Sequence, residues 1–380
     1  MYVRWVDRLL NTLNSSNNLV KFRVAFSLSS AFTLWIDEWL SYAVNRKVES
    51  LDLILGTDLP QDCYSFPYKQ GNFPDNLKLL KKLSLHSVIV SGEAVAFMLG
   101  NCHLLEQLSV SRIGSLESLK VVQTSPVFKC LEISQCNSLN LVVVRESKVV
   151  CIKYDGATNQ YCSFTFVDVP LLTQLWIRAK AHNPFVNFTS IISILDMFDY
   201  VIPQLHMLKI YATVRLQDED IIKKLMPKLK ELVVVFDSNY CDKWSLMPVI
   251  SWFRMTPCLQ RFVVEAPHQE KNKKCLNSIK CYDCWHLRFY KREYNFGRVN
   301  SPIKEIEFVG YRGVLNHFQM ITQFVELGAA IDKIIVDPRP FKLRSYMPWD
   351  RISQNDTKDE IFARNCAKDQ LKHYPRVNIL

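Results

Sequence analysis

The stretch Leu105-Glu-Gln-Leu-Ser-Val110 recurs in altered form three more times along the chain. The copies read Phe128-Lys-Cys-Leu-Glu-Ile133, Val149-Val-Cys-Ile-Lys-Tyr154 and Leu172-Thr-Gln-Leu-Trp-Ile177. Between their fourth residues, at Leu108, Leu131, Ile152 and Leu175, the steps are 23, 21 and 23 residues. A phrase with apolar residues at its first, fourth and sixth positions and a period in the low twenties predicts one strand per repeat.

This period and phrase are typical of leucine-rich repeats, whose strands stack into a parallel sheet. Successive side chains of a strand face opposite ways, so the leucines and isoleucines should point into the core and the residues between them should line the concave face. One repeat cannot bury its apolar side alone, so the stack shares one continuous core. We therefore predict an α/β leucine-rich-repeat solenoid with a curved parallel sheet, and with helices and short extended segments on the convex side.

The same phrase occurs both before and after this regular block. It precedes the block at Val48–Leu53 and Leu80–Leu85 and follows it at five places, the last at Ile331–Val336. These occurrences together predict eleven strands. Their centres lie near residues 51, 83, 108, 131, 152, 175, 208, 232, 262, 306 and 334.

The segments between the strands differ along the chain. Ser91 is a candidate N-cap for a short helix over Gly92–Leu99, and helical spacing predicts further helices at 191–200, 218–226 and 247–255. In the regular block the segments around Leu119, Leu141 and Phe164 are instead short and rich in valine. They are too short for helices, so we predict extended segments there.

Both ends differ from the repeats, as the ends of an open stack must. Residues 1–47 predict a helical N-terminal cap with helices over Tyr2–Leu13 and Thr33–Asn45, residues 48–300 form the solenoid, and residues 301–380 form C-terminal repeats and a cap. In that last part we predict a helix at 317–327 and a final helix at 358–373 that closes the chain.

Composition limits the class of protein. Of 380 residues 48% are apolar, the formal net charge is +10, and the excess positive charge is spread along the sequence. No apolar run reaches the roughly 20 residues that a membrane helix needs, and the first residues carry Arg4 and Asp7 where a signal peptide needs an apolar core. The 12 cysteines are then expected as free thiols in a reducing compartment, the cytoplasm or the nucleus.

The sequence offers little that suggests chemistry. Cys281-Tyr-Asp-Cys284 has the spacing of a zinc-binding pair, but its possible partners are unevenly placed, and ordinary loop thiols are the preferred reading. Glycine-rich phosphate loops and hydrolase or metalloprotease motifs are absent from the sequence. We predict no enzyme activity, no cofactor and no metal site. The full set of possible zinc ligands is His268, Cys275, Cys281, Cys284 and His286.

The predicted concave face carries the best candidates for binding. Trp176 and the nearby Arg178 stand out because Trp and Arg dominate binding hot spots, although packing of Trp176 under a loop or against neighbouring side chains is the preferred reading. The candidate protein-binding residues on this face are Lys153, Gln174, Trp176, Arg178, Lys209 and Tyr211.

The order of several segments resembles one family. Trp35–Leu53, Val169–Ile177, Ile303–Tyr311 and Lys333–Arg339 look like the corresponding parts of plant F-box/LRR-repeat proteins, including their FBD-like C-terminal region. Members of that family begin with an F-box of about fifty residues, and the sequence given starts at the segment that follows it. The resemblance implies that the solenoid recognises a target protein while an F-box docks on the adaptor of a cullin-based ubiquitin ligase.

We therefore predict a non-catalytic protein-recognition solenoid like the substrate-binding part of such a receptor. The partner is an unknown target protein, with no direct binding to the ligase adaptor expected without an F-box and no membrane association. A small-molecule receptor is the first alternative, with residues 266–301 as a lid over the concave face. A nucleic-acid binder is the second and is favoured only by the net charge.

Overall fold

The computed structural model describes residues 2–12, 18–56, 62–68, 77–122, 125–157, 162–180, 195–212, 225–236, 252–253, 255–266, 302–313, 315–327, 331–339 and 356–380. The chain forms two compact units, Met1–Trp176 and Ile177–Leu380.

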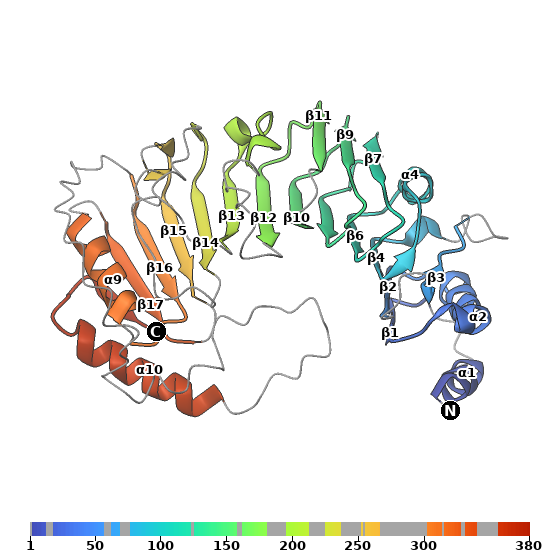
Figure 1. The fold of residues 1–380 in the computed structure, drawn as a ribbon, viewed down its shortest axis with the longest axis horizontal. Coiled ribbons are helices and arrows are strands. Elements are labelled where there is room, and N and C mark those ends of the chain that lie inside the picture. Colours follow the sequence, from blue (N-terminus) through green and yellow to red (C-terminus); the bar gives the residue numbers. More distant parts are fainter. Residues whose placement is uncertain are drawn as a thin grey trace. The chain divides into compact units, whose positions relative to one another are not determined.

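Parallel strands in chain order form the main sheet of the first unit (Figure 1). The registers place Leu83, Leu108, Leu131 and Ile152 side by side on adjacent strands, as the phrase spacing predicts. All four side chains are at most 1% exposed, so they form the core. The strands are β1 (Lys21–Phe26), β2 (Ser50–Leu55), β4 (Lys82–His86), β6 (Gln107–Ser111), β8 (Cys130–Ser134), β10 (Cys151–Ala157) and β12 (Gln174–Lys180), the last of which runs past the end of this unit.

The second unit repeats the arrangement with longer intervals between its strands. Leu232, Phe262, Ile306 and Ile334 pair in register and are buried. Its strands are β13 (Met207–Ala212), β14 (Glu231–Phe236), β15 (Arg261–Glu265), β16 (Glu305–Val309), β17 (Lys333–Asp337) and β18 (Val377–Ile379). The structure therefore confirms all eleven predicted strands and the leucine-rich-repeat fold class.

Among the described residues, two strands of the large parallel sheet were missed, and both lie at its edges. β1 pairs with β2 alone, and β18 pairs with β17 alone, within the described residues. An edge strand buries less of its surface, so it does not need the full leucine phrase: in β1 only Val24 is buried. The structure therefore adds a strand to the two helices predicted for residues 1–47, and the prediction that the last helix closes the chain is wrong, because β18 follows that helix.

Helices lie in the N-terminal part of the first unit and in the C-terminal part of the second. α1 (Tyr2–Thr12) and α2 (Thr33–Asn45) match the predicted N-terminal pair, and α2 buries Trp39 among its apolar residues. In the second unit the Phe324 ring of α9 (Leu315–Leu327) packs edge-on at 5.7 Å from the Phe262 ring of β15. α10 (Asp356–Leu371) follows and buries Leu371.

Beside the main sheet of the first unit, the valine-rich segments are extended, as predicted. β7 (Ser118–Val122), β9 (Leu141–Arg145) and β11 (Ser163–Val167) form a separate parallel sheet in the order β11-β9-β7. The short strands β3 (Tyr64–Ser65) and β5 (Val88–Ile89) pair with each other. Each of the helices predicted at 191–200, 218–226 and 247–255 lies partly outside the described residues.

The predicted helix at Gly92 is α4 (Gly92–Asn101), and its N-cap is confirmed. The Ser91 hydroxyl accepts a hydrogen bond of 3.2 Å from the backbone N–H of Ala94. A Cβ on Gly92 would collide with the carbonyl oxygen of Ser118, so glycine allows this helix to approach β7 closely. Gly310, after β16, has a φ of +85°, which side chains rarely allow, and a Cβ at this position would also collide with the carbonyl oxygen of Ala266. Both the backbone conformation and the lack of space therefore favour glycine.

Two buried histidines make stability depend on pH. Burial, with a smaller contribution from Arg112, lowers the pKa of His86 from 6.5 to about 4. Burial and then Arg312 lower the pKa of His317 to about 3. As the pH falls below 6.5, the unfolded chain takes up protons at these positions while the folded chain does not, so stability decreases until the pH reaches the folded pKa.

We expect the free energy of unfolding to fall between pH 6.5 and pH 4 by up to about 1.4 kcal/mol per pH unit for each histidine. The His86→Gln variant should show a shallower decrease, because glutamine does not titrate. Urea denaturation across this pH range measures both slopes. Equal slopes for the two proteins would contradict the assignment of His86 as a buried neutral side chain.

Candidate functional site

We call the side of each main sheet whose residues alternate with the buried leucines the open face. In the first unit it carries Lys153, Gln174 and Trp176, all half-buried. The Lys153 ammonium lies 4.5 Å from the centroid of the Trp176 ring and 3.9 Å from a Glu132 carboxylate oxygen. The structure therefore brings Lys153 and Trp176 together as a cation–π pair. The Lys153 ammonium also forms an ion pair with the Glu132 carboxylate.

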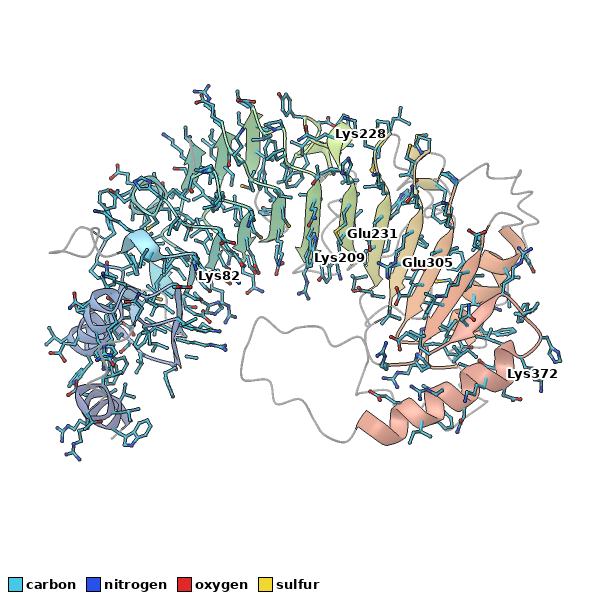
Figure 2. All side chains as sticks on the ribbon, turned by 180° about the vertical axis from the view of Figure 1, so that it is seen from behind. Lys82, Lys209, Lys228, Glu231, Glu305 and Lys372 are labelled. Atoms are coloured by element: carbon cyan, nitrogen blue, oxygen red, sulfur yellow. The ribbon has the colours of Figure 1, made fainter. Side chains whose placement is uncertain are left out.

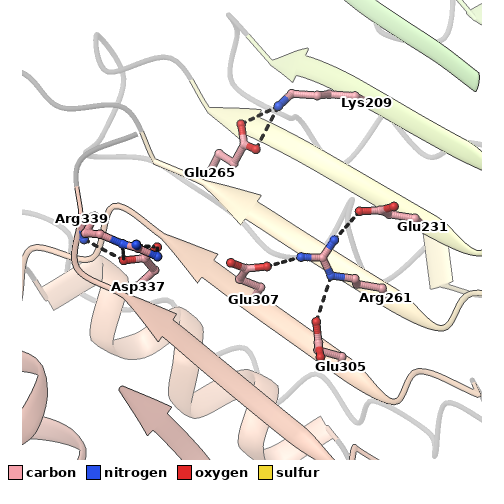
Figure 3. Close-up of polar contacts among 8 residues, drawn as sticks. All are labelled: Lys209, Glu231, Arg261, Glu265, Glu305, Glu307, Asp337 and Arg339. Carbon is pink, nitrogen blue, oxygen red and sulfur yellow. Dashed lines mark hydrogen bonds and ion pairs between the residues drawn. The ribbon is translucent and has the colours of Figure 1, made fainter. Parts of the chain in front are cut away.

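In the second unit Arg178, Lys209 and Tyr211 also meet. The guanidinium of Arg178 and the ammonium of Lys209 each lie 5.4 Å from the centroid of the Tyr211 ring. Lys209 is 8% exposed and donates hydrogen bonds of 2.9 and 2.8 Å to the two carboxylate oxygens of Glu265 (Figure 3). Its positive charge is thus largely matched within the chain, which gives Lys209 a structural role.

Glu265 is the other half of this buried ion pair. Burial raises the pKa of its carboxyl group, while Lys209 acts in the opposite direction. The side chains of Lys209 and Glu265 are 10% and 13% exposed, and they come from β13 and β15, on either side of β14. A charge pair this poorly solvated is costly to break on one side only.

The most elaborate cluster on the open face was not singled out from the sequence. Arg261 on β15 donates from Nη1 to Glu231 on β14 at 2.6 Å and from Nε to Glu305 on β16 at 2.9 Å. Its Nη2 donates to Glu307, also on β16 (Figure 3). We call these four residues the Arg261 cluster. One guanidinium therefore links three carboxylates on two neighbouring strands, which leaves an excess of negative charge.

The sequence held a signal for this cluster. Glu231, Arg261 and Glu305 occupy the same position of three successive strand phrases, and the registers pair them directly. Alternating charges at one phrase position predict cross-strand ion pairs once the strands are known to be neighbours. Figure 2 shows Glu231 and Glu305 on the strands of the second unit, together with Lys209.

Buried apolar side chains pack together beside the Arg261 cluster. Val233, Val235 and Val263 are only 2–4% exposed, and Met207, Tyr211 and Val309 pack against them. In contrast, the Arg261 side chain is 42% exposed, and those of Glu231 and Glu305 are 30% and 31% exposed. The Arg261 cluster on this face therefore presents partly exposed charges, acidic in sum, beside a buried apolar patch.

A second arginine–carboxylate pair ends β17. The carboxylate of buried Asp337 accepts hydrogen bonds from the backbone N–H and the guanidinium of Arg339, the shortest at 2.7 Å (Figure 3). This bidentate contact holds the chain where it leaves the strand. Asp337 and Arg339 both belong to the segment Lys333–Arg339, on which part of the resemblance depends.

The described residues hold neither a cluster of metal-binding side chains nor a membrane-spanning helix. They contain no group of three or more histidine, cysteine or acidic side chains placed to hold a metal ion. The candidate zinc ligands His268, Cys275, Cys281, Cys284 and His286 lie outside the described residues, as does most of the predicted lid at 266–301. None of the helices described is long and apolar enough to cross a membrane.

Comparisons with known proteins agree with this fold. Residues 73–335 match the family model of the At1g61320/AtMIF1 leucine-rich-repeat domain. The F-box/LRR-repeat protein At3g03360 of Arabidopsis thaliana is 27% identical over 166 residues, which cover 39% of this chain and 34% of that protein. The chain thus spans about a third of the length of this relative. Because the family model covers more than half of the chain, the protein belongs to the At1g61320/AtMIF1 family of leucine-rich-repeat domains.

Proposed function

We propose that this protein recognises a target protein through the open face of its second unit, without catalysing a reaction. The leucine-rich-repeat domain and the similarity to an F-box/LRR-repeat protein support a protein-interaction solenoid. The observation that carries the more specific proposal is the Arg261 cluster, where Arg261 is held between Glu231, Glu305 and Glu307.

Three physical features suit this surface to binding. The charged groups stand on neighbouring strands of one sheet, so little conformational freedom is lost when a partner docks. Arg261 and two of its glutamates are about one-third exposed or more, so a partner can reach them. Buried Val233 and Val263 hold the strands beneath them rigid.

Charge complementarity indicates the kind of target. The Arg261 cluster has three carboxylates for one guanidinium, although the whole chain carries a net charge of +10. A target segment with lysine or arginine side chains would complete the ion pairs that Arg261 alone leaves unbalanced. Electrostatic matching of this kind contributes mainly to specificity and to the rate of association.

By similarity to the F-box/LRR-repeat protein, we propose that target recognition serves a ubiquitin ligase, in the cytoplasm or nucleus. The eight cysteines described are all free, which suits a reducing compartment. This role predicts that the captured target accumulates in plants that lack the protein. Quantitative immunoblotting of the target in plants with and without the gene measures this effect, and equal target levels would argue against the ligase role while leaving target binding untouched.

Target binding itself is tested by neutralising the surface. We expect the Glu231→Gln/Glu305→Gln variant to capture its main partner from plant extract at least about tenfold less well than the unmodified chain, a loss of about 1.4 kcal/mol. Affinity capture followed by quantitative mass spectrometry measures the ratio. Glutamine keeps the shape of each side chain, so the change is mainly one of charge.

The matched control is Glu117→Gln/Glu326→Gln. It removes the same charge from two exposed glutamates, one in the turn before β7 and one on α9. The control should capture the partner as well as the unmodified chain, and thermal melting should show that both variants are folded. Equal capture by all three proteins would show that the Arg261 cluster is not the binding surface.

A further inference from the structure

Two cysteines lie next to each other on the open face of the first unit. Cys130 is the first residue of β8, Cys151 is the first residue of β10, and the two are direct partners in the parallel register. Both are free thiols. Adjacent strands lie about 4.8 Å apart, a separation within the range of Cα–Cα distances that a disulfide bond spans.

The surroundings give the two sulfur atoms different characters. The pKa of the Cys130 thiol is lowered, first by a side-chain hydrogen bond with Cys151 and further by the charges of Lys153 and Lys82, although burial and the charge of Glu132 act against them. The same hydrogen bond and burial raise the pKa of the Cys151 thiol. Cys130 is also the more exposed of the two, since it is half-buried while Cys151 is buried. Cys130 is thus the better nucleophile for the first attack. Once the Cys130 sulfur is held in a mixed disulfide, the hydrogen bond that chiefly raises the pKa of Cys151 is lost, and Cys151 is the neighbouring thiol placed to resolve that disulfide.

Cys102, a fully buried thiol in the same unit, is expected to be much less reactive than Cys130. Cys102 is fully buried after α4, and burial alone raises the pKa of its thiol to about 12. A thiol with so little thiolate and no solvent access reacts slowly. Cys102 therefore provides an internal reference for the reactivity of the pair.

We propose that Cys130 and Cys151 form a reversible redox site that oxidised glutathione, or another small disulfide, converts to an intramolecular disulfide. The Cys130 thiolate attacks one sulfur of the small disulfide, which breaks the S–S bond and releases one thiolate. The Cys151 thiol then loses its proton and attacks the Cys130 sulfur, which releases the second thiolate and leaves the bond between Cys130 and Cys151. The two protein thiols are oxidised, and the small disulfide is reduced to two thiols.

The site is distinct from the proposed target-binding surface, because Cys130 and Cys151 belong to the first unit and the Arg261 cluster to the second. The redox proposal depends only on the pairing of β8 and β10 and on the chemistry of the two thiols. It therefore stands or fails independently of the proposed function.

The test uses the whole purified chain equilibrated with mixtures of oxidised and reduced glutathione, then alkylated and digested with trypsin. Cleavage after Lys129, Arg145, Lys148 and Lys153 places Cys130 and Cys151 on separate peptides, so their disulfide appears as a linked pair. We expect this linked pair to be the main oxidised product, and dithiothreitol should remove it. Cys136 lies on the Cys130 peptide, so fragmentation, or a Cys136→Ser variant that keeps the link, identifies the sulfur involved.

Variants separate the two roles. Cys151→Ser should stop at a mixed disulfide between Cys130 and glutathione, Cys130→Ser should give no link, and Cys102→Ser should behave like the unmodified chain. A variant that fails to fold would not block the test, because the unmodified protein alone can be compared in buffer and in urea. The disulfide between Cys130 and Cys151 should be the main oxidised product in buffer, where the strands are paired, and not in urea. A native chain in which Cys130 stays reduced, or carries glutathione without forming the link, would overturn the proposal.

Discussion

The Leu131→Ala variant should lose about 2 to 5 kcal/mol of unfolding free energy, the cost of a cavity in a packed core. Leu131 is completely buried on β8, between Leu108 of β6 and Ile152 of β10. The neighbouring strands are held in register by backbone hydrogen bonds, so they cannot close the gap freely. Urea denaturation followed by circular dichroism measures the loss.

The control is Leu171→Ala. Leu171 is 47% exposed and lies in the turn before β12, outside the strand phrase. A surface truncation of this kind should change stability by less than about 0.5 kcal/mol. Similar effects for Leu131→Ala and Leu171→Ala would mean that the leucine of the strand phrase is not the core residue of the repeat.

Lys209→Met should be nearly as damaging, at about 3 kcal/mol, because it removes one partner of a buried ion pair. Glu265 would keep its negative charge in a poorly solvated place, with its side chain 13% exposed. Burial already raises the pKa of Glu265, and loss of the ammonium should raise that pKa further. The deficit should therefore shrink as the pH is lowered and Glu265 becomes protonated in the folded state.

A double variant gives the control for this prediction. Lys209→Met/Glu265→Leu replaces both charges with apolar groups, which is often close to neutral for a buried pair. It should recover most of the stability that Lys209→Met loses in urea denaturation at neutral pH. If the double variant is as unstable as Lys209→Met, the aliphatic stem of the lysine or the shape of Glu265 matters more than the charge.

Most of the fold was predictable because the leucine phrase is under strong physical constraint. Each copy must bury its apolar residues against the next repeat, so Leu131 and Ile306 carry the same signal although the intervals around them differ. The edge strands β1 and β18 escaped prediction because each pairs on one side within the described residues. Strand β18 has only three residues, so its sequence carries almost no pattern.

The candidate site was predictable only in part. Residue type pointed to Trp176 and Lys209, and the structure does place them on the open face. Their pairing could not be read from the sequence, because the partners lie far along the chain: Lys209 meets Glu265, 56 residues later. Lys209 and Glu265 stand at different positions of their phrases. Which side chains neutralise one another across an intervening strand depends on rotamers, and the repeat pattern does not encode those.

The central claim, that a target binds through the Arg261 cluster, is tested most directly by calorimetric titration of the purified captured target at two salt concentrations. The account predicts that Glu231→Gln/Glu305→Gln weakens binding at least about tenfold at low salt and reduces the salt dependence, because fewer ion pairs form across the interface. The Glu117→Gln/Glu326→Gln control should keep both the affinity and the salt dependence. An unchanged dissociation constant and an unchanged salt dependence in the Glu231→Gln/Glu305→Gln variant would contradict the account.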